Sequence, residues 1–246
     1  MHEHELWLTA LFNQNLAGPA NSILHAVGVH PHDPAKPWSN WMVMQLLVFA
    51  IILIVAPVVK ASLSIDRPGK LAQIFELLWE FIAGMAHDVV GHGSKKHAYL
   101  FGTLFVFILF SNLLGIIPTF ESPTMSYFVP AGCAMLVFLY YNIQGVKEQG
   151  PIGHLKHFWG PVWWLGPFMF AVEIISHCIR PVSLTIRLFA NMLAGEMVTV
   201  AFLALIPIGV PIIFMGLHTF VSFVQAFIFT VLTMAYVAGA VEHEEH

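Results

Sequence analysis

Residues 162–206 read VWWLGPFMFAVEIISHCIRPVSLTIRLFANMLAGEMVTVAFLALI, a long and almost uninterrupted apolar stretch. About 40 residues in a helix, at 1.5 Å each, would be roughly twice as long as the 30 Å hydrocarbon core of a bilayer. The stretch therefore predicts a membrane helix that is either strongly tilted or broken near Pro167 and Pro181.

A second apolar stretch runs from Ile212 to Val241, after the break PIGVP at residues 207–211, which is typical of a tight turn. The two stretches predict a long tilted hairpin over residues 162–241. Three shorter apolar stretches precede them, each near the length of about 20 residues that a spanning helix needs: Met42–Val59, Ala98–Ile117 and Phe128–Gly145. The expected fold is all-α and polytopic, with about five spanning segments.

The composition agrees with lipid as the solvent of this chain. Of its 246 residues 58% are hydrophobic and only 10% are charged, against about 25% charged residues in soluble domains. The net charge of -4 leaves no basic face, so nucleic acid is not expected as a partner. Cys133 and Cys178 lie inside apolar stretches and form no CxxC pair, so neither a redox site nor a zinc site is predicted.

Residues 1–41 are expected to form an exterior N-terminal segment, ahead of a membrane domain over residues 42–246. The N-terminus carries His and Glu where a signal peptide would carry Lys or Arg, and its apolar patch from Leu6 to Phe12 is short for a secretory segment.

The segment from Leu71 to Val90 has the pattern of an amphipathic helix. Its apolar residues recur at helical spacing, and Glu76, Glu80 and His87 lie off that stripe. The stripe consists of Leu71, Phe75, Leu78, Ile82, Met85 and Val89. We expect this helix to lie on the membrane surface. The alternative is a sixth crossing with buried glutamates.

Positive charge predicts the topology, because cytoplasmic loops are enriched in Lys and Arg. These residues fall between the first and second spans and between the third and fourth: Lys60, Arg67, Lys70, Lys95, Lys96, Lys147 and Lys156. The loop from Thr119 to Tyr127 has neither Lys nor Arg. We therefore expect the N-terminus outside and the C-terminus in the cytoplasm.

The fourth stretch carries charges that are costly in lipid, by about 2.5–3.5 kcal/mol each on insertion scales. Most of its polar and small residues follow one another by threes and fours and share one helix face: Glu173, Ser176, Arg180, Ser183, Arg187, Asn191 and Ala194. This face must meet water or another polar surface.

Glu196 points to the opposite side of the same helix from Arg187. Glu173 lies about 21 Å from Arg187 towards the cytoplasm, and Glu196 lies about 13 Å towards the exterior. The pattern is the one expected of two separate aqueous half-channels with a fixed positive barrier between them. Arginine suits the barrier because it keeps its proton inside proteins. The alternative is a structural ion pair between Arg187 and a glutamate.

The last stretch supplies possible partners, because His218, Ser222 and Gln225 line one helix face. Glu196 and His218 stand at comparable distances from the predicted turn, so they could pair across the hairpin. Such a pair is suited to passing protons, since histidine titrates near neutral pH.

Residues 180–196, RPVSLTIRLFANMLAGE, resemble the signature of subunit a of the F-type (rotary) ATP synthases, bacterial type, at every fixed position. Residues 111–118, 217–229 and 68–71 with Glu76 are also similar to that family, and the resemblance covers roughly residues 40–240. Some relatives carry an acidic residue where Gly115 stands here. The resemblance implies a multi-pass stator subunit of the bacterial inner membrane that is no enzyme by itself but couples proton flow to ATP synthesis.

In that family subunit a loads and unloads the carboxylates of a rotating c-ring. The expected partners are the c-ring, b-type peripheral stalk subunits, membrane lipid and, indirectly, the soluble catalytic sector. The resemblance implies that Arg187, Asn191 and Ala194 face the rotor. It places Glu196, His218, Asn191, Gln225 and Asn112 on the exterior pathway and Glu173 and Ser183 on the cytoplasmic one.

Two other functions remain open from the residues alone. A secondary transporter would explain intramembrane charges, and it predicts discontinuous helices around a central substrate site. A membrane enzyme with a Glu–His site would act on a small substrate without a rotor. No cofactor and no metal site are expected, because the histidines lack zinc-site spacing with cysteine and form no intramembrane pairs for haem.

Overall fold

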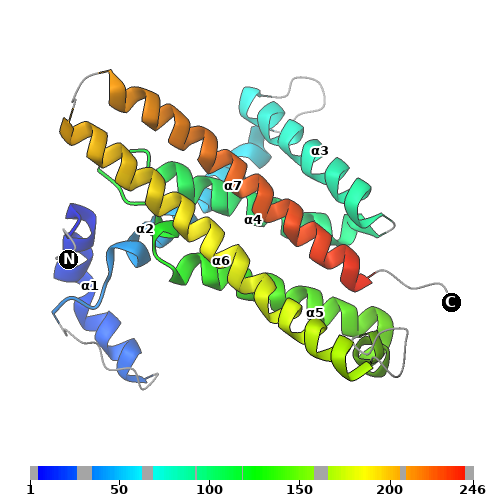
Figure 1. The fold of residues 1–246 in the computed structure, drawn as a ribbon. Helices are drawn as coiled ribbons and strands as arrows, with labels where there is room; N and C mark the ends of the chain where they lie inside the picture. The colour runs from blue at the N-terminus through cyan, green and yellow to red at the C-terminus, as the bar shows by residue number, and fades with distance from the viewer. Residues whose placement is uncertain are drawn as a thin grey trace.

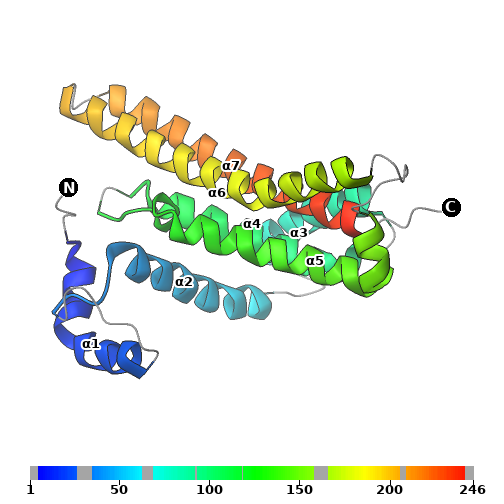
Figure 2. The same cartoon turned by 60° about the horizontal axis from the view of Figure 1, so that its bottom comes forward.

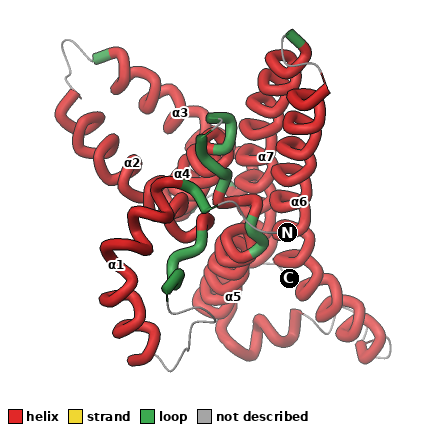
Figure 3. Tube along the Cα trace, turned by 90° about the vertical axis from the view of Figure 1, so that its left-hand side faces the viewer, coloured by secondary structure: helices red, strands yellow, loops and turns green. Residues whose placement is uncertain are grey.

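The computed structural model describes residues 5–26, 35–62, 69–91, 93–117, 119–157, 166–205 and 209–241. Helices make up almost all of this part of the chain, as Figure 3 shows, and it contains no strand. In chain order the elements are α1 (Trp7–Ala26), α2 (Asn40–Ser62), α3 (Lys70–Val90), α4 (Ser94–Leu114), the short 3-10 helix η1 (Pro123–Met125), α5 (Phe128–His157), α6 (Gly166–Leu205) and α7 (Val210–Val241). The expected all-α fold is confirmed.

Five of these helices are long and apolar enough to cross a membrane: α2, α4, α5, α6 and α7. They correspond to the five predicted stretches. The third stretch continues further than expected, because α5 runs on to His157 past a kink at Gly150, whose φ is 73°. Of the predicted turn after α6, residues 207 and 208 lie outside the described residues. So do Arg67 in the α2–α3 connection and most of the histidines near the two ends of the chain: His2, His4, His30, His32, His243 and His246.

The long fourth stretch forms one continuous helix of 40 residues, with Pro181 inside it. Pro167 stands in its first turn, where the missing backbone N–H costs no hydrogen bond. Of the two expectations for this stretch, the unbroken helix is the correct one. At about 1.5 Å per residue it is too long to cross a 30 Å hydrocarbon core upright.

Helices α6 and α7 run antiparallel, side by side, over almost their whole length (Figures 1 and 2). Near the turn the rings of Phe202 and Phe214 stack with centroids 4.1 Å apart. Far from the turn the Arg180 guanidinium lies 5.3 Å from the centroid of the Tyr236 ring. These contacts set the register of the predicted hairpin.

The remaining helices support this hairpin from one side. In Figure 2, α6 and α7 form the upper layer, α4 and α5 lie beneath them, and α2 lies below these. The largest fully buried side chains come from α2, α3, α4, α5, α6 and α7: Tyr141, Phe101, Phe105, Met44, Ile82, Ile108, Leu188, Met192 and Met234. The core therefore holds the polar face of α6 at a defined position.

Helix α3 lies along α4 and beside α7 (Figure 1), and its packed face differs in part from the predicted stripe. Ile82 is buried as expected, but Ala72 and Ala86 are buried beside it while Leu71 and Val89 are 53% and 39% exposed. Helix α3 therefore packs on its neighbours through Ala72, Ile82 and Ala86, and the two ends of the predicted apolar stripe stay exposed. That α3 lies on the membrane surface stays a prediction, and α3 is not among the candidate spans.

The N-terminal segment contains a helix, α1, that sequence analysis did not predict. It is tied to the start of α2: Asn13 accepts a hydrogen bond from the backbone N–H of Trp38 at 3.0 Å and donates one to Glu5 at 2.8 Å. Lys36 lies 2.6 Å from Glu5. The hydrogen bonds from Lys36 and Asn13 hold the pKa of the Glu5 carboxyl below its ordinary value.

Candidate functional site

Arg187 stands near the middle of α6 with no carboxylate partner among the described residues. Its Nη2 donates only a long hydrogen bond of 3.4 Å to Ser183 Oγ, one turn earlier. The other arginine of the helix behaves differently, because Arg180 lies 3.6 Å from the Glu173 carboxylate. The alternative of a structural ion pair between Arg187 and a glutamate therefore finds no support in the described part of the chain.

The polar face of α6 borders the outer surface of the hairpin. Leu184, Leu188 and Met192 are buried against the bundle, whereas Ile186 is 58% exposed. Arg187 and Asn191 are half-buried between these two sides, and Ala194 is exposed. One side of the Arg187 guanidinium is thus covered by its own chain. The other side is open and could contact a partner that packs against α6.

A cavity of about 180 Å³ lies between α6, α7 and the segment after α4. Its lining includes Glu196, Thr199 and His218, with Gly115 and Phe120 from the other side. Both Glu196 Oε2 and His218 Nε2 are buried and have no hydrogen-bond partner in the described chain. The structure therefore brings Glu196 and His218 to one cavity, as expected, although they form no direct hydrogen bond. Water molecules with polar partners fit a space of this size.

Gly195 makes room for the His218 ring. A Cβ atom built at Gly195 would lie 2.8 Å from His218 Nδ1 and 3.0 Å from Cε1, closer than side chains approach. The imidazole consequently packs directly on the backbone of α6, one residue before Glu196. The small residue at this position decides how near the two titratable groups come.

The predicted polar face of α7 is the face that packs inside the bundle. His218 is 7% exposed, Ser222 is fully buried and Gln225 is 8% exposed. Ser222 Oγ lies 3.9 Å from Met192 Sδ. With the register set by the Gly195–His218 and Met192–Ser222 contacts, Gln225 falls about one turn further along α7, near the level of Arg187.

Asn112 is fully buried, and its amide bridges three segments. Its Nδ2 donates to the backbone carbonyl of Ser222 at 3.2 Å, and its Oδ1 accepts from Thr124 at 2.7 Å. It is not among the residues that line the cavity. These hydrogen bonds therefore join α4 to η1 and α7.

The chain at Gly115 has no space for a side chain. A Cβ there would lie 2.7 Å from Ser122 Cβ and 3.0 Å from the Ser122 backbone nitrogen. Ser122 is held in turn by a hydrogen bond of 2.9 Å to the Ser111 carbonyl. In this chain the loop after α4 therefore folds back closely against the end of α4.

Glu121 is a carboxylate at this site that sequence analysis missed. Its Oε2 accepts a hydrogen bond of 3.2 Å from Asn40, and its charge lies close enough to Glu196 for the two to interact. Asn40 Oδ1 also accepts a hydrogen bond of 3.3 Å from the backbone N–H of Leu6. The sequence did contain a hint of this residue, because Glu121 is the one charged residue between Thr119 and Tyr127. Its position beside Glu196 depends on the loop conformation.

A second polar cluster, which the sequence analysis also missed, lies where α5 meets α6. His177 Nε2 lies 2.9 Å from Asn142 Oδ1, and the Tyr141 hydroxyl lies 3.3 Å from the same ring nitrogen. One turn further on is Arg180, paired with Glu173. These groups lie on the side of Arg187 opposite to the Glu196 cavity along α6.

The described residues contain no group of three or more His, Cys, Asp and Glu side chains that could hold a metal ion. The two long helices of the hairpin are continuous in the described part of the chain. A secondary transporter with discontinuous helices at a central site predicts a different arrangement.

Comparison with known proteins places this chain in one family. A family model described as ATP synthase A chain matches residues 42–238. The chain is 53% identical over 234 residues to ATP synthase subunit a of Solibacter usitatus, covering 95% of this chain and 100% of that protein. It is 46% identical over 240 residues to ATP synthase subunit a of Koribacter versatilis, covering 98% of each chain. A protein of the same name from Bdellovibrio bacteriovorus is 50% identical over 175 residues, covering 71% of this chain and 76% of that protein.

Proposed function

Because this chain belongs to the family of ATP synthase subunit a, a multi-pass membrane subunit of the proton-translocating sector of the complex, we propose that it provides two offset half-channels separated by Arg187. Each half-channel is a water-filled route that reaches the middle of the membrane from one side only. Protons move between them by riding on carboxylates of a rotating c-ring. The subunit is not an enzyme by itself.

One observation carries this proposal: the arginine in the middle of α6 has no carboxylate partner among the residues that the structure describes. A charge in an apolar membrane helix is costly and needs a partner, which for Arg187 must come from elsewhere. A ring carboxylate at about 4 Å would interact with Arg187 by roughly 4 kcal/mol at an effective dielectric near 20. Such an attraction favours the ionised carboxylate and is small enough for rotation to break.

The exterior half-channel uses the cavity that Glu196 and His218 line. Glu121, Asn191 and Gln225 belong to the same side of the proposed route, and Asn112 positions α7 beside it. The proton carriers are Glu196 and His218, because both have a buried titratable atom without a partner in the described chain. The arrangement suits protons, since a histidine that passes protons is a poor ligand for sodium.

The cytoplasmic half-channel runs along the other half of α6, past Ser183 towards Glu173. The ion pair of Arg180 with Glu173 and the cluster of His177 with Tyr141 and Asn142 supply polar groups there. The two routes lie on opposite sides of Arg187 along the helix axis. A proton therefore cannot pass between them without the moving carboxylate.

The proposed topology places residues 1–41 outside and the C-terminus in the cytoplasm of a bacterial inner membrane, with the membrane domain over residues 42–246. The proposed partners are the c-ring against the exposed side of α6, b-type peripheral stalk subunits and, through them, the soluble catalytic sector. The positive loops support this orientation, because Lys60, Lys70 and Lys95 are exposed at ends of helices on the proposed cytoplasmic side.

Replacing Glu196 with glutamine should slow proton flow while the complex still assembles. Glutamine keeps the size and polarity of the side chain but takes up no proton at neutral pH. The measurement is passive proton flux through vesicles that contain the membrane sector. Glu148→Gln is the control, because Glu148 pairs with Lys96 at the surface and outside the cavity. Equal flux in the two variants would remove Glu196 from the pathway.

A cysteine at Asn191 should form a disulfide with a cysteine placed near the carboxylate of a ring subunit. Asn191 is half-buried one turn beyond Arg187 on the proposed rotor face. Cross-linking in membranes under mild oxidation measures this contact, and a cysteine at Gln144, which is buried inside the bundle, is the control. Failure at Asn191 and also at Ala194 would show that this face does not meet the ring.

A further inference from the structure

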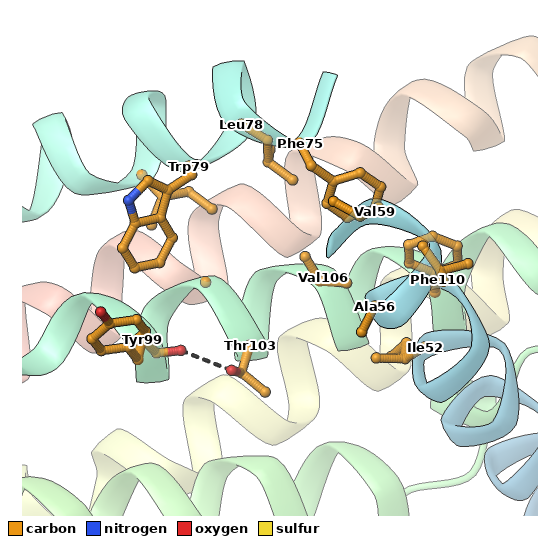
Figure 4. A pocket seen from close by; sticks show the side chains of 13 residues that line it. Ile52, Ala56, Val59, Phe75, Leu78, Trp79, Tyr99, Thr103, Val106 and Phe110 are labelled. Carbon is orange, nitrogen blue, oxygen red and sulfur yellow. Dashed lines mark hydrogen bonds between the residues drawn. The ribbon is translucent and has the colours of Figure 1, made fainter. Parts of the chain in front are cut away.

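Outside the Glu196 cavity the structure holds an apolar groove and a polar cluster. Figure 4 shows the groove between α2, α3 and α4, where a dashed line marks the hydrogen bond of 2.8 Å from the Thr103 hydroxyl to the Tyr99 carbonyl. None of the described residues that line the groove is a His, an Asp or a Glu, so it offers no group that exchanges protons near neutral pH. The polar cluster between α5 and α6 is different, because it contains His177.

His177 lies in α6 between Arg187 and the proposed cytoplasmic end of the route. It stands ten residues before Arg187, about 15 Å along the helix axis, and four residues after Glu173, about 6 Å along the axis. It is the one histidine between these two residues, and histidine is the side chain that ordinarily gains and loses a proton near neutral pH. Arg180, in the same stretch, keeps its proton.

The hydrogen bonds of Asn142 fix the orientation of the His177 imidazole. Asn142 Nδ2 donates to the Phe138 carbonyl at 2.6 Å, one turn earlier in α5, so its Oδ1 faces His177 as an acceptor. His177 Nε2 lies 2.9 Å from this oxygen and therefore carries a hydrogen. In the neutral imidazole, Nδ1 is then the atom that takes up a proton.

Both neighbours of the imidazole suit its neutral and its charged form. Asn142 Oδ1 accepts the hydrogen of Nε2 in either form. The Tyr141 hydroxyl lies 3.3 Å from Nε2 and 3.4 Å from Nδ1. It can donate to Nδ1 of the neutral imidazole, and its oxygen can accept from Nδ1 of the charged one. The imidazole can therefore change its protonation state without losing its place between α5 and α6.

The charges beside His177 largely offset each other. Arg180 and Glu173 are its neighbours on the surface of α6, and their side chains lie 3.6 Å apart. From α7 the Tyr236 ring lies against Arg180, with 5.3 Å between the guanidinium carbon and the ring centroid. A paired cation and anion do not hold the imidazole in one charge state. His177 itself is half-buried, so one part of the imidazole is accessible from outside the bundle.

We propose that His177 is the proton carrier of the cytoplasmic half-channel. This proposal rests on the proposed function, because it needs a water-filled route along this part of α6. Nδ1 accepts a proton that a c-ring carboxylic acid has given up through water, which leaves a carboxylate opposite Arg187. The imidazolium then releases this proton to water on the Glu173 side and becomes neutral again. Asn142 and Tyr141 are positioning residues that hold the imidazole.

The test measures passive proton flux in inverted vesicles whose complexes assembled in the cell, after the soluble sector has been washed off. Flux runs outwards from a lumen of fixed pH. The outer, cytoplasmic pH is varied over the range of about 5 to 8 in which histidine titrates, while a potassium diffusion potential keeps the total driving force constant. A charged imidazole cannot accept another proton, so the flux should fall as the outer pH is lowered through this range.

His177→Gln keeps a donor for Asn142 but takes up no proton. It should lower the flux about tenfold or more, and the remaining flux should lack the fall at low outer pH. The control is His97→Gln. His97 also bonds to a tyrosine hydroxyl of α5, that of Tyr140 at 2.7 Å, but it belongs to α4, so this variant should keep the normal flux and pH profile. Unchanged flux in His177→Gln, or a lower flux with the same fall, would overturn the proposal.

Asn142→Asp gives a readout that a mere packing role would not change. An aspartate 2.9 Å from Nε2 stabilises the charged imidazole, so the imidazole keeps its proton up to a higher pH. The fall in flux should therefore move to higher outer pH, by about one pH unit or more. The amount of assembled subunit is measured in each preparation. A fall that stays in place, or that moves to lower pH, would contradict the role of His177.

Failure of this proposal can be told apart from failure of the proposed function. If Arg187→Ala no longer pumps while His177→Gln keeps a normal flux and pH profile, the half-channels stand and His177 is not their cytoplasmic carrier. If Arg187→Ala pumps normally, the half-channel proposal itself is wrong.

Discussion

Replacing Arg187 with alanine should abolish ATP-driven proton pumping, with the complex still assembled and still hydrolysing ATP. In the proposed mechanism the guanidinium is the fixed charge that makes a deprotonated ring carboxylate tolerable in the membrane, and it also separates the two half-channels. Arg187 has no carboxylate partner of its own in the described chain and only a 3.4 Å contact to Ser183, so its loss leaves no buried ion unpaired and should not unfold the subunit.

The measurement is acidification of inverted vesicles after addition of ATP, with hydrolysis and subunit content measured in the same preparation. Arg187→Lys serves as the matched variant, because a lysine keeps the charge at first but loses its proton more readily when desolvated. We expect the lysine variant to pump poorly and to leak protons passively. Normal pumping by Arg187→Ala would rule out the assignment of this residue.

Replacing Gly195 with alanine should reduce proton flux about tenfold or more, although the change adds only one methyl group. The new Cβ would lie 2.8 Å from His218 Nδ1, so the imidazole must move away from α6 and from Glu196. A displacement of about 1 Å in a reacting group can cost on the order of a hundredfold in rate. Passive flux through the membrane sector measures the effect.

Gly132→Ala provides the control for this change. Gly132 lies in α5, and a Cβ there meets nothing within 4 Å, so alanine should be neutral or stabilise the helix by about 1 kcal/mol. The double variant Gly195→Ala with His218→Ala identifies the cause. If Gly195 acts through His218, the double variant should be no slower than His218→Ala alone. Fully additive losses would show that Gly195 acts on something else.

Hydropathy and spacing alone were enough to predict the helices that bear the site. The five apolar stretches all became long apolar helices, because a backbone in lipid must satisfy its hydrogen bonds within each helix whatever the neighbours are. The position of Arg187 among apolar residues and the shared face of His218, Ser222 and Gln225 followed from helical periodicity for the same reason. These features depend on one helix at a time.

The features that the sequence left open depend on how helices meet. Pro181 could have broken α6, and only the packing of α6 against α7 and α5 shows that the helix continues. Helix α3 packs on its neighbours through Ala72, Ile82 and Ala86, while Leu71 and Val89 stay exposed, since the neighbouring helices decide which face of a helix is buried within the protein. Helical periodicity alone does not predict which apolar residues will pack against a neighbouring helix.

The cavity that Glu196 and His218 line likewise depends on the tertiary structure. The amino-acid pattern placed Glu196 and His218 at similar distances from a turn, but their common space depends on Gly195, on the loop at Gly115 and on the register of the hairpin. Glu121 comes near Glu196 through the loop after α4, and no spacing rule predicts this approach. The sequence by itself determined which residues lie in the membrane helices and on which face. The tertiary structure decided which of those faces meet, because close packing depends on the shapes of both partners at once.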